Sequence, residues 1–185
     1  LRKFNVIYNM LDKERLLPNE NFTYRKNGKL NLLVASSHRY LKNLNGLIEG
    51  VHLMDSQYRD NLRISWFGNS RFDTSLEDGL QKIQSYGLQD IFSFHKETLN
   101  IYDYMREADA VGLFSFFEGL PNAICEGMYM GKPIVATRVS DVPLLVEDNV
   151  NGFLCEANSP SSISHALTLL VKCSVVELSD KIGRA

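Results

Sequence analysis

Short apolar runs alternate with amphipathic stretches about five times along this chain, and this alternation constrains the fold more than any other feature. The runs are apolar at nearly every position, which is typical of parallel strands covered by helices on both faces. The stretches between them carry apolar residues at helical spacing. The pattern predicts an α/β fold with a doubly wound parallel sheet. The expected strands are 30–36, 62–68, 90–95, 109–115, 132–137 and 151–155.

The length favours one domain, since 185 residues match the ~100–200 that a single core serves. Residues 1–29 lack sustained periodicity and are interpreted as an opening or interdomain segment, followed by one domain over 30–185. The chain opens on Leu1 and stops soon after helical sequence. We therefore expect a fragment of a longer protein.

Composition and charge exclude several classes of protein. Lys and Arg total 20 against 22 for Asp and Glu, so the chain lacks the basic field that nucleic acid binding needs. Its three cysteines lie far apart without a C-x-x-C pair, which indicates neither a disulfide framework nor a zinc site and fits a cytoplasmic setting. No apolar run approaches the ~20 residues of a transmembrane segment. Neither a G-x-G-x-x-G nor a P-loop sequence occurs.

Ligands of such sheets bind beyond the carboxyl ends of the strands, which directs attention to loops 35–43, 67–73 and 115–122. In the last loop Gly119 gives the backbone room to approach a ligand, and Pro121 suits the first position of a helix. A helix that begins at about Pro121 would point the N–H groups of its first turn at an anion such as a phosphate. Those groups belong to Asn122, Ala123 and Ile124.

Two glutamates accompany this predicted helix. Glu126 lies four residues after Asn122 on the same face, where its carboxylate can accept hydrogen bonds from a pair of vicinal hydroxyls, as in a ribose. Glu118 ends the loop before the helix. The spacing alone leaves an alternative open, in which Glu118 caps the helix electrostatically and Glu126 is a solvated helix residue. The nearby aromatic residues are expected in the strand core: Phe114, Phe116 and Phe117.

The segment SFFEGLPNAICEGMYMGKPIVAT (115–137) resembles the E-x7-E signature of the GT-B glycosyltransferases, in particular the retaining family 4 pattern EG-x-P-N-x-x-x-E-x-M-x-x-G-x-P-x-V-A-T. Glu118 and Glu126 fall at its two glutamates. Four further segments resemble parts of the same family. The interdomain segment of the family resembles NVIYNMLD (5–12), and its second strand with the following glycine turn resembles DNLRISWFGN (60–69), which contains Gly68. The strand before its base-binding loop resembles GLQDIFSFH (87–95), and its final strand and helix resemble EDNVNGFLCEANSPSSISHAL (147–167).

The loop after the first strand departs from the family pattern. In the family it reads G-R-x-x-x-x-K, and its arginine and lysine neutralise the donor diphosphate. Here Lys42 keeps the place of the lysine, while Ser36 takes the nominal place of the arginine. Arg39 is the candidate for the second cation. A lysine before a helix opposes the helix dipole, so Lys42 needs another reason to be there.

The resemblance implies a Rossmann-like domain, the C-terminal half of a GT-B enzyme that moves a sugar from a nucleoside diphosphate sugar of UDP or GDP type. It implies that Lys42 and Arg39 hold the diphosphate, with Glu118 at the donor sugar as the third residue of the catalytic set. The donor-binding set comprises Glu126 at the ribose, the backbone of Gly119 and Leu120 at the sugar, the helix tip from Pro121 to Ile124, and three residues near the donor crevice: His38, Gly68 and His95.

No cofactor or metal is expected, since the chain lacks the D-x-D triplet of the GT-A fold. The resemblance implies that the acceptor, a glycan or a lipid-linked glycan, would bind an N-terminal domain that this chain lacks, and that any membrane association would come through that domain. A noncatalytic alternative stays open, because fold does not settle function: the same fold can serve as a nucleotide sensor or a protein-interaction module.

Overall fold

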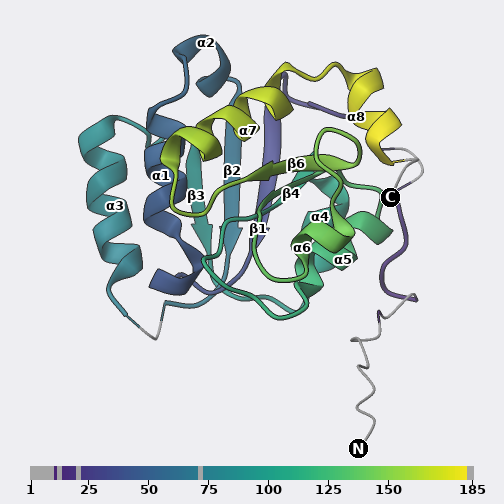
Figure 1. The fold of residues 1–185 in the computed structure, drawn as a ribbon, viewed down its shortest axis with the longest axis horizontal. Helices are drawn as coiled ribbons and strands as arrows, with labels where there is room; N and C mark the ends of the chain where they lie inside the picture. Colours follow the sequence, from purple (N-terminus) through teal and green to yellow (C-terminus); the bar gives the residue numbers. More distant parts are fainter. Residues whose placement is uncertain (1–10, 12–13, 20–21, 71–72, 183–185) are drawn as a thin grey trace, which may run out of the picture.

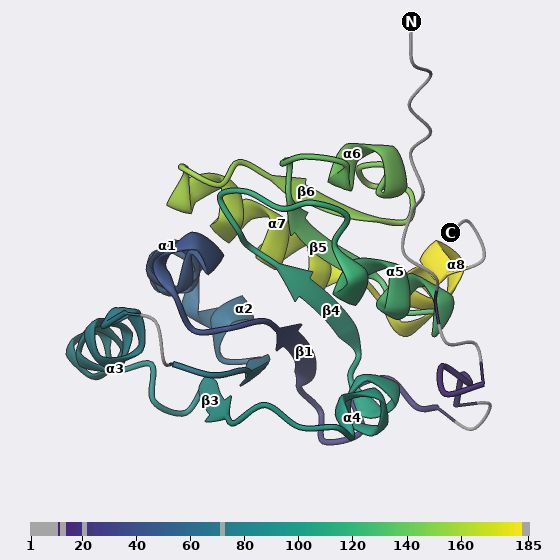
Figure 2. The same ribbon diagram turned by 90° about the horizontal axis from the view of Figure 1, so that it is seen from below.

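The computed structural model describes residues 11, 14–19, 22–70 and 73–182. Six parallel strands form one sheet in the order β3-β2-β1-β4-β5-β6 (Figures 1 and 2). All six predicted strands are confirmed, with ends within two residues of those expected. The strands are β1 (Leu30–Ala35), β2 (Leu62–Phe67), β3 (Phe92–His95), β4 (Ala110–Leu113), β5 (Ile134–Thr137) and β6 (Gly152–Cys155).

Helices cover both faces of the sheet, as the two views show (Figures 1 and 2). One face packs against α1 (Leu44–His52), α3 (Ser75–Tyr86) and α7 (Pro160–Lys172). The other face packs against α4 (Ile101–Glu107), α5 (Asn122–Tyr129) and α6 (Val142–Leu145). The remaining elements are the 3₁₀ turn η1 (Tyr40–Lys42), α2 (Ser56–Arg59) and α8 (Val175–Ile182).

Apolar side chains on both faces of the central strands make the core. Every residue of β4 and β5 is buried, which explains their unbroken apolar sequence. Trp66 and Phe114 are among the largest fully buried side chains, and each such burial contributes about 1.5–3 kcal/mol. Gly127 brings α5 against β4, because a Cβ atom there would stand 2.9 Å from Val111 Cγ2. This close packing of α5 on β4 fixes the position of the helix and therefore of its N-terminus.

The strand order reverses between β1 and β4. β1 pairs with β2 on one side and with β4 on the other, and the chains that leave β1 and β4 turn to opposite faces of the sheet. Doubly wound sheets bind ligands in the crevice that opens at such a point. The candidate loops after β1 and β4 lie there.

Part of the opening segment packs onto the domain. Leu16 is fully buried in the cluster beneath α4 and α5, and Tyr24 is buried on the opposite face. The resemblance of NVIYNMLD (5–12) falls outside the described residues apart from Leu11. Within the described ranges, every helix is too short or too polar to span a bilayer.

Candidate functional site

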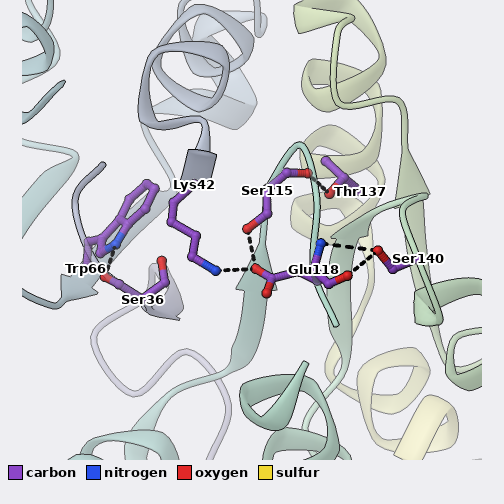
Figure 3. A network of polar contacts seen from close by, with 7 residues as sticks. All are labelled: Ser36, Lys42, Trp66, Ser115, Glu118, Thr137 and Ser140. Carbon is purple, nitrogen blue, oxygen red and sulfur yellow. Dashed lines mark hydrogen bonds and ion pairs between the residues drawn. The ribbon is translucent and has the colours of Figure 1, made fainter. Parts of the chain in front are cut away.

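Backbone hydrogen bonds join the loops after β1, β2 and β3 into one surface. The Ser36 N–H donates to the Phe67 carbonyl, and the Gly68 N–H donates to the His95 carbonyl, both over 3.0 Å. A Cβ atom at position 68 would stand 1.9 Å from the Ser36 carbonyl oxygen. That oxygen also accepts a 2.8 Å hydrogen bond from Trp66 Nε1 (Figure 3). Only glycine permits this approach, so Gly68 sets the shape of the surface.

An ion pair between the loops after β1 and β4 forms the centre of the site. Lys42 Nζ lies 2.5 Å from Glu118 Oε1, and both side chains are only 13% exposed. The same oxygen accepts a 2.5 Å bond from Ser115 Oγ, and the Glu118 backbone N–H donates to Ser140 Oγ over 3.2 Å. Figure 3 shows Lys42 and Glu118 reaching toward each other, with Thr137 bonded to the Ser115 carbonyl beyond them. Two residues from separate motifs thus meet at one point.

Backbone contacts hold the loop that carries Lys42. The Phe116 N–H donates to the Leu41 carbonyl over 2.9 Å, which joins this loop to the one that carries Glu118. Asn43 adopts the left-handed conformation, and its side-chain oxygen accepts from the Gly46 N–H over 3.1 Å, capping α1. Lys42 directly precedes this capped N-terminus, where a cation opposes the helix dipole. Its position therefore favours a role at the site over one in helix stability.

The first turn of α5 and the ion pair line one cavity of about 300 Å³. The lining residues are Ala35, Ser36, Ser37, Lys42, Leu113, Glu118, Leu120, Pro121, Asn122 and Ala123. Pro121 occupies the cap position, one residue before the helix. The prediction for Ile124 is wrong, because its N–H donates to the Pro121 carbonyl over 3.0 Å and closes the first turn. Asn122 and Ala123 are the helix residues at the cavity.

The loop after β1 holds the serine at the family's arginine position and also Arg39, the candidate for the second cation. Counted back from Lys42 by the family spacing, the arginine position is Ser37 rather than Ser36, and both serines line the cavity. Arg39 is half-buried near Asp73, whose pKa is lowered first by the Tyr40 N–H and also by the Arg39 charge. Arg39 does not line the cavity beside Lys42 in the described part of the chain. Its role as the second cation stays a prediction.

Glu126 faces helix α4. Its Oε1 accepts a 3.1 Å hydrogen bond from the Tyr102 hydroxyl, and its side chain is half-buried. Burial raises the pKa of Glu126, and the bond from Tyr102 partly offsets that rise. Among the described residues, Glu126 is not part of the lining of the cavity beside Lys42. Gly119 lies between two lining residues, with open space where a Cβ atom would stand.

A second cavity, of about 550 Å³, follows β2 and β3. His38 is 3% exposed, and both of its ring nitrogens are buried. Burial lowers the pKa of His38, and the Trp66 backbone offsets this in part. The predicted donor-binding residues His38, Gly68 and His95 come together here. They share the lining with Asn69, Ser70, Leu76, Phe94, Lys96 and Glu97.

Some features of the site had no signal in the sequence. Ser140, in the loop after β5, contacts the Glu118 backbone although it lies 22 residues further along the chain. Tyr102 reaches Glu126 from another helix. All three aromatic residues lie beyond the strand, because β4 ends at Leu113. Phe114 is buried in the core as predicted, whereas Phe116 is only half-buried and the prediction is wrong for Phe117, which is 64% exposed.

Comparison with known proteins identifies a family for this chain. The family model described as glycosyl transferases group 1 matches residues 18–185. An uncharacterized glycosyltransferase of Haemophilus influenzae is 30% identical over 184 residues, which cover 97% of this chain and 50% of the relative. A D-inositol 3-phosphate glycosyltransferase of Streptomyces griseus is 30% identical over 111 residues, covering 58% of this chain and 23% of that protein. The chain thus spans at most about half the length of these curated relatives.

Solved structures share the fold. HepE of Anabaena, solved in complex with UDP and glucose, superposes with a TM-score of 0.84 at 21% identity, over 97% of this chain and 50% of that one. The C-terminal domain of a glycosyl transferase group 1 protein of Francisella tularensis has a TM-score of 0.80 at 20% identity, over 95% of this chain and 94% of that domain. The chain belongs to the glycosyl transferases group 1 family, and its fold is that of the C-terminal GT-B domain.

Proposed function

We propose that the chain is the donor-binding domain of a retaining glycosyltransferase and binds a nucleoside diphosphate sugar of UDP or GDP type. The observation that carries this proposal is the 2.5 Å pair of Lys42 and Glu118 beside the first turn of α5. A cation and helix amides suit a diphosphate, and a carboxylate suits sugar hydroxyls, so one cavity serves both parts of such a donor. HepE, which shares the fold, was solved with UDP-glucose.

Charge stabilisation is the main chemical task of this site. Negative charge grows on the β-phosphate as its bond to the anomeric carbon of the sugar breaks. Lys42 and the N–H groups of Asn122 and Ala123 would stabilise that charge, because fixed donors aimed at developing charge lower the barrier. A diphosphate beside Lys42 competes with Glu118 for the ammonium group. Donor binding would therefore exchange an internal ion pair for a phosphate contact and release the Glu118 carboxylate to the sugar hydroxyls.

The rest of the donor would extend along the same edge of the sheet. Glu126 would accept hydrogen bonds from the ribose hydroxyls, while the backbone of Gly119 and Leu120 would contact the sugar. The buried ring of His38 and the strand end at His95, which share the larger cavity, would contact the nucleotide.

The acceptor, a glycan or a lipid-linked glycan, would bind outside this chain, on the N-terminal domain of the complete enzyme. The coverage of only half of the Haemophilus relative supports this division. We expect the chain by itself to bind donor with little or no sugar transfer.

A second candidate function is a noncatalytic nucleotide sensor or protein-interaction module on the same fold. The observation that favours it is the serine at the arginine position of the family, since one of the two cations expected at the diphosphate is replaced there. A nucleotide sensor would bind UDP as the donor domain does, whereas an interaction module would bind no nucleotide. Transfer assays with the complete enzyme separate the sensor from the donor domain.

Calorimetric titration of the chain with UDP and GDP tests donor binding. Lys42→Ala should weaken binding of the preferred nucleotide about 10- to 100-fold, because a charge-assisted hydrogen bond contributes about 1.5–3 kcal/mol. Lys82→Ala is a matched control, since Lys82 forms a 2.8 Å ion pair with Glu49 away from the site. This control should leave the affinity unchanged.

Two results would contradict the proposed function. The first is a folded wild-type chain that shows no binding heat with any nucleoside diphosphate. The second is an equal loss of affinity in Lys42→Ala and Lys82→Ala, which would indicate a general effect of removing a lysine charge.

A further inference from the structure

The hydroxyl group of Tyr102 connects helix α4 to Glu126 on helix α5. It donates to Glu126 Oε1 over 3.1 Å, between residues 24 positions apart in the chain. We propose that Tyr102 is a positioning residue that orients the Glu126 carboxylate toward the ribose hydroxyls of the donor. Tyr102 then sets how strongly the chain prefers a ribonucleotide to its dideoxy analogue. This inference rests on the proposed function, because it needs a nucleotide at Glu126.

The hydrogen bond prepares the carboxylate for two hydroxyl donors. A glutamate side chain has several rotatable bonds, and ordering them at the moment of binding costs free energy. A carboxylate that is already held avoids that cost, which is the general benefit of preorganisation. Tyr102 uses one acceptor position of Glu126, and a carboxylate has about four, so enough remain for a vicinal pair of hydroxyls.

The same bond helps to keep Glu126 ionised. The side chain is half-buried, and burial raises its pKa, which favours the neutral acid. A protonated carboxyl group loses acceptor capacity. The hydrogen bond from Tyr102 stabilises the charged form and lowers the pKa. Tyr102 therefore supports both the orientation and the charge state that accept two hydroxyl groups.

Arg15 lies over the face of the Tyr102 ring. The guanidinium carbon lies 5.1 Å from the ring centroid, and Arg15 Nη2 donates to the Leu99 carbonyl over 3.1 Å, just before α4 begins. A cation over an aromatic face is attracted to the ring. The ring thus has contacts at its face and at its hydroxyl group.

Calorimetric titrations with UDP and with 2′,3′-dideoxy-UDP test this role in the wild-type chain, Glu126→Ala and Tyr102→Phe. The wild type should bind UDP at least about tenfold more tightly than the dideoxy analogue, since hydrogen bonds to a charged group are strong. Glu126→Ala should lose this preference. Tyr102→Phe keeps the ring and should lower the preference at least about threefold, while affinity for the dideoxy analogue stays unchanged.

Tyr104→Phe is the matched control, because Tyr104 lies on the same helix and its ring packs against Phe67 at 4.5 Å. It should retain the wild-type preference. If Tyr102→Phe prefers UDP over the dideoxy analogue as strongly as the wild type does, the positioning role is overturned. This holds even if the variant binds both nucleotides more weakly. If Glu126→Ala also kept the preference, the ribose assignment of Glu126 would fall with it. Absence of UDP binding to the wild type would overturn the proposed function as well.

Discussion

Replacing Glu118 by glutamine should change stability and nucleotide affinity in opposite directions. The Glu118 carboxylate pairs with Lys42 Nζ at 2.5 Å, and both side chains are 13% exposed, so the pair is far more enclosed than an ordinary surface ion pair. Glutamine keeps the shape of the side chain and can still accept from Ser115 Oγ. It lacks the charge that holds the lysine.

Both effects can be estimated from this geometry. A largely buried charge that loses its partner costs about 1–3 kcal/mol, which for a chain of this size lowers Tm by about 2–12 °C. In Glu118→Gln, the diphosphate of UDP no longer competes with a carboxylate for the Lys42 ammonium group. If that competition costs about 1–2 kcal/mol in the wild type, UDP binds about 5- to 30-fold more tightly to Glu118→Gln.

Thermal unfolding and calorimetric titration of UDP against the same preparation measure the two effects. Glu49→Gln is the matched control, since it breaks the 2.8 Å pair with Lys82, whose side chains are each 31% exposed. It should lower Tm by less and leave UDP affinity unchanged. A Glu118→Gln chain that binds UDP more weakly than the wild type would refute the competition between carboxylate and diphosphate.

Three further predictions concern the loops and the ribose carboxylate. Gly68→Ala should lower the free energy of unfolding by about 3 kcal/mol or more, because its Cβ would stand 1.9 Å from the Ser36 oxygen; a loss below about 1 kcal/mol in urea would contradict this. Burial raises the pKa of Glu126, so UDP affinity should be full above that raised pKa and fall as the pH drops through it. Calorimetry should show no such step in Glu126→Gln, and identical pH profiles would count against the ribose role. Asn43→Ala removes the cap of α1 and should cost about 1 kcal/mol in the same urea assay, whereas an unchanged midpoint would argue against it.

The sequence predicts the fold well because the strands are buried on both faces. An apolar run such as 132–137 is typical of a strand buried on both faces, and it coincides with β5 to within two residues. The opening segment was predicted less well. Leu16 is fully buried against the domain, but a single leucine in an irregular stretch gives no periodicity that would indicate its packing.

The chemistry of the site is only partly visible in the sequence. The motif identifies Glu118 and the first turn of α5, since the spacing of a loop and a helix is local. The contact of Glu118 with Lys42 spans 76 positions, and that of Tyr102 with Glu126 joins two helices. Such pairs depend on how the sheet brings distant loops together, which no local pattern reports. The Ile124 prediction was wrong for a local reason, because the amide closes the first turn of its own helix.

An amide NMR titration of the ¹⁵N-labelled chain with UDP tests the placement of the diphosphate most directly. If the N-terminus of α5 and the loop before α1 bind the diphosphate, the largest amide chemical-shift changes fall on Leu120, Ala123 and Lys42. Changes centred instead on the 380 Å³ cavity beside α7 and α8, which is lined by Lys172 and Cys173 together with the carboxylates of Glu177 and Asp180, would contradict that placement.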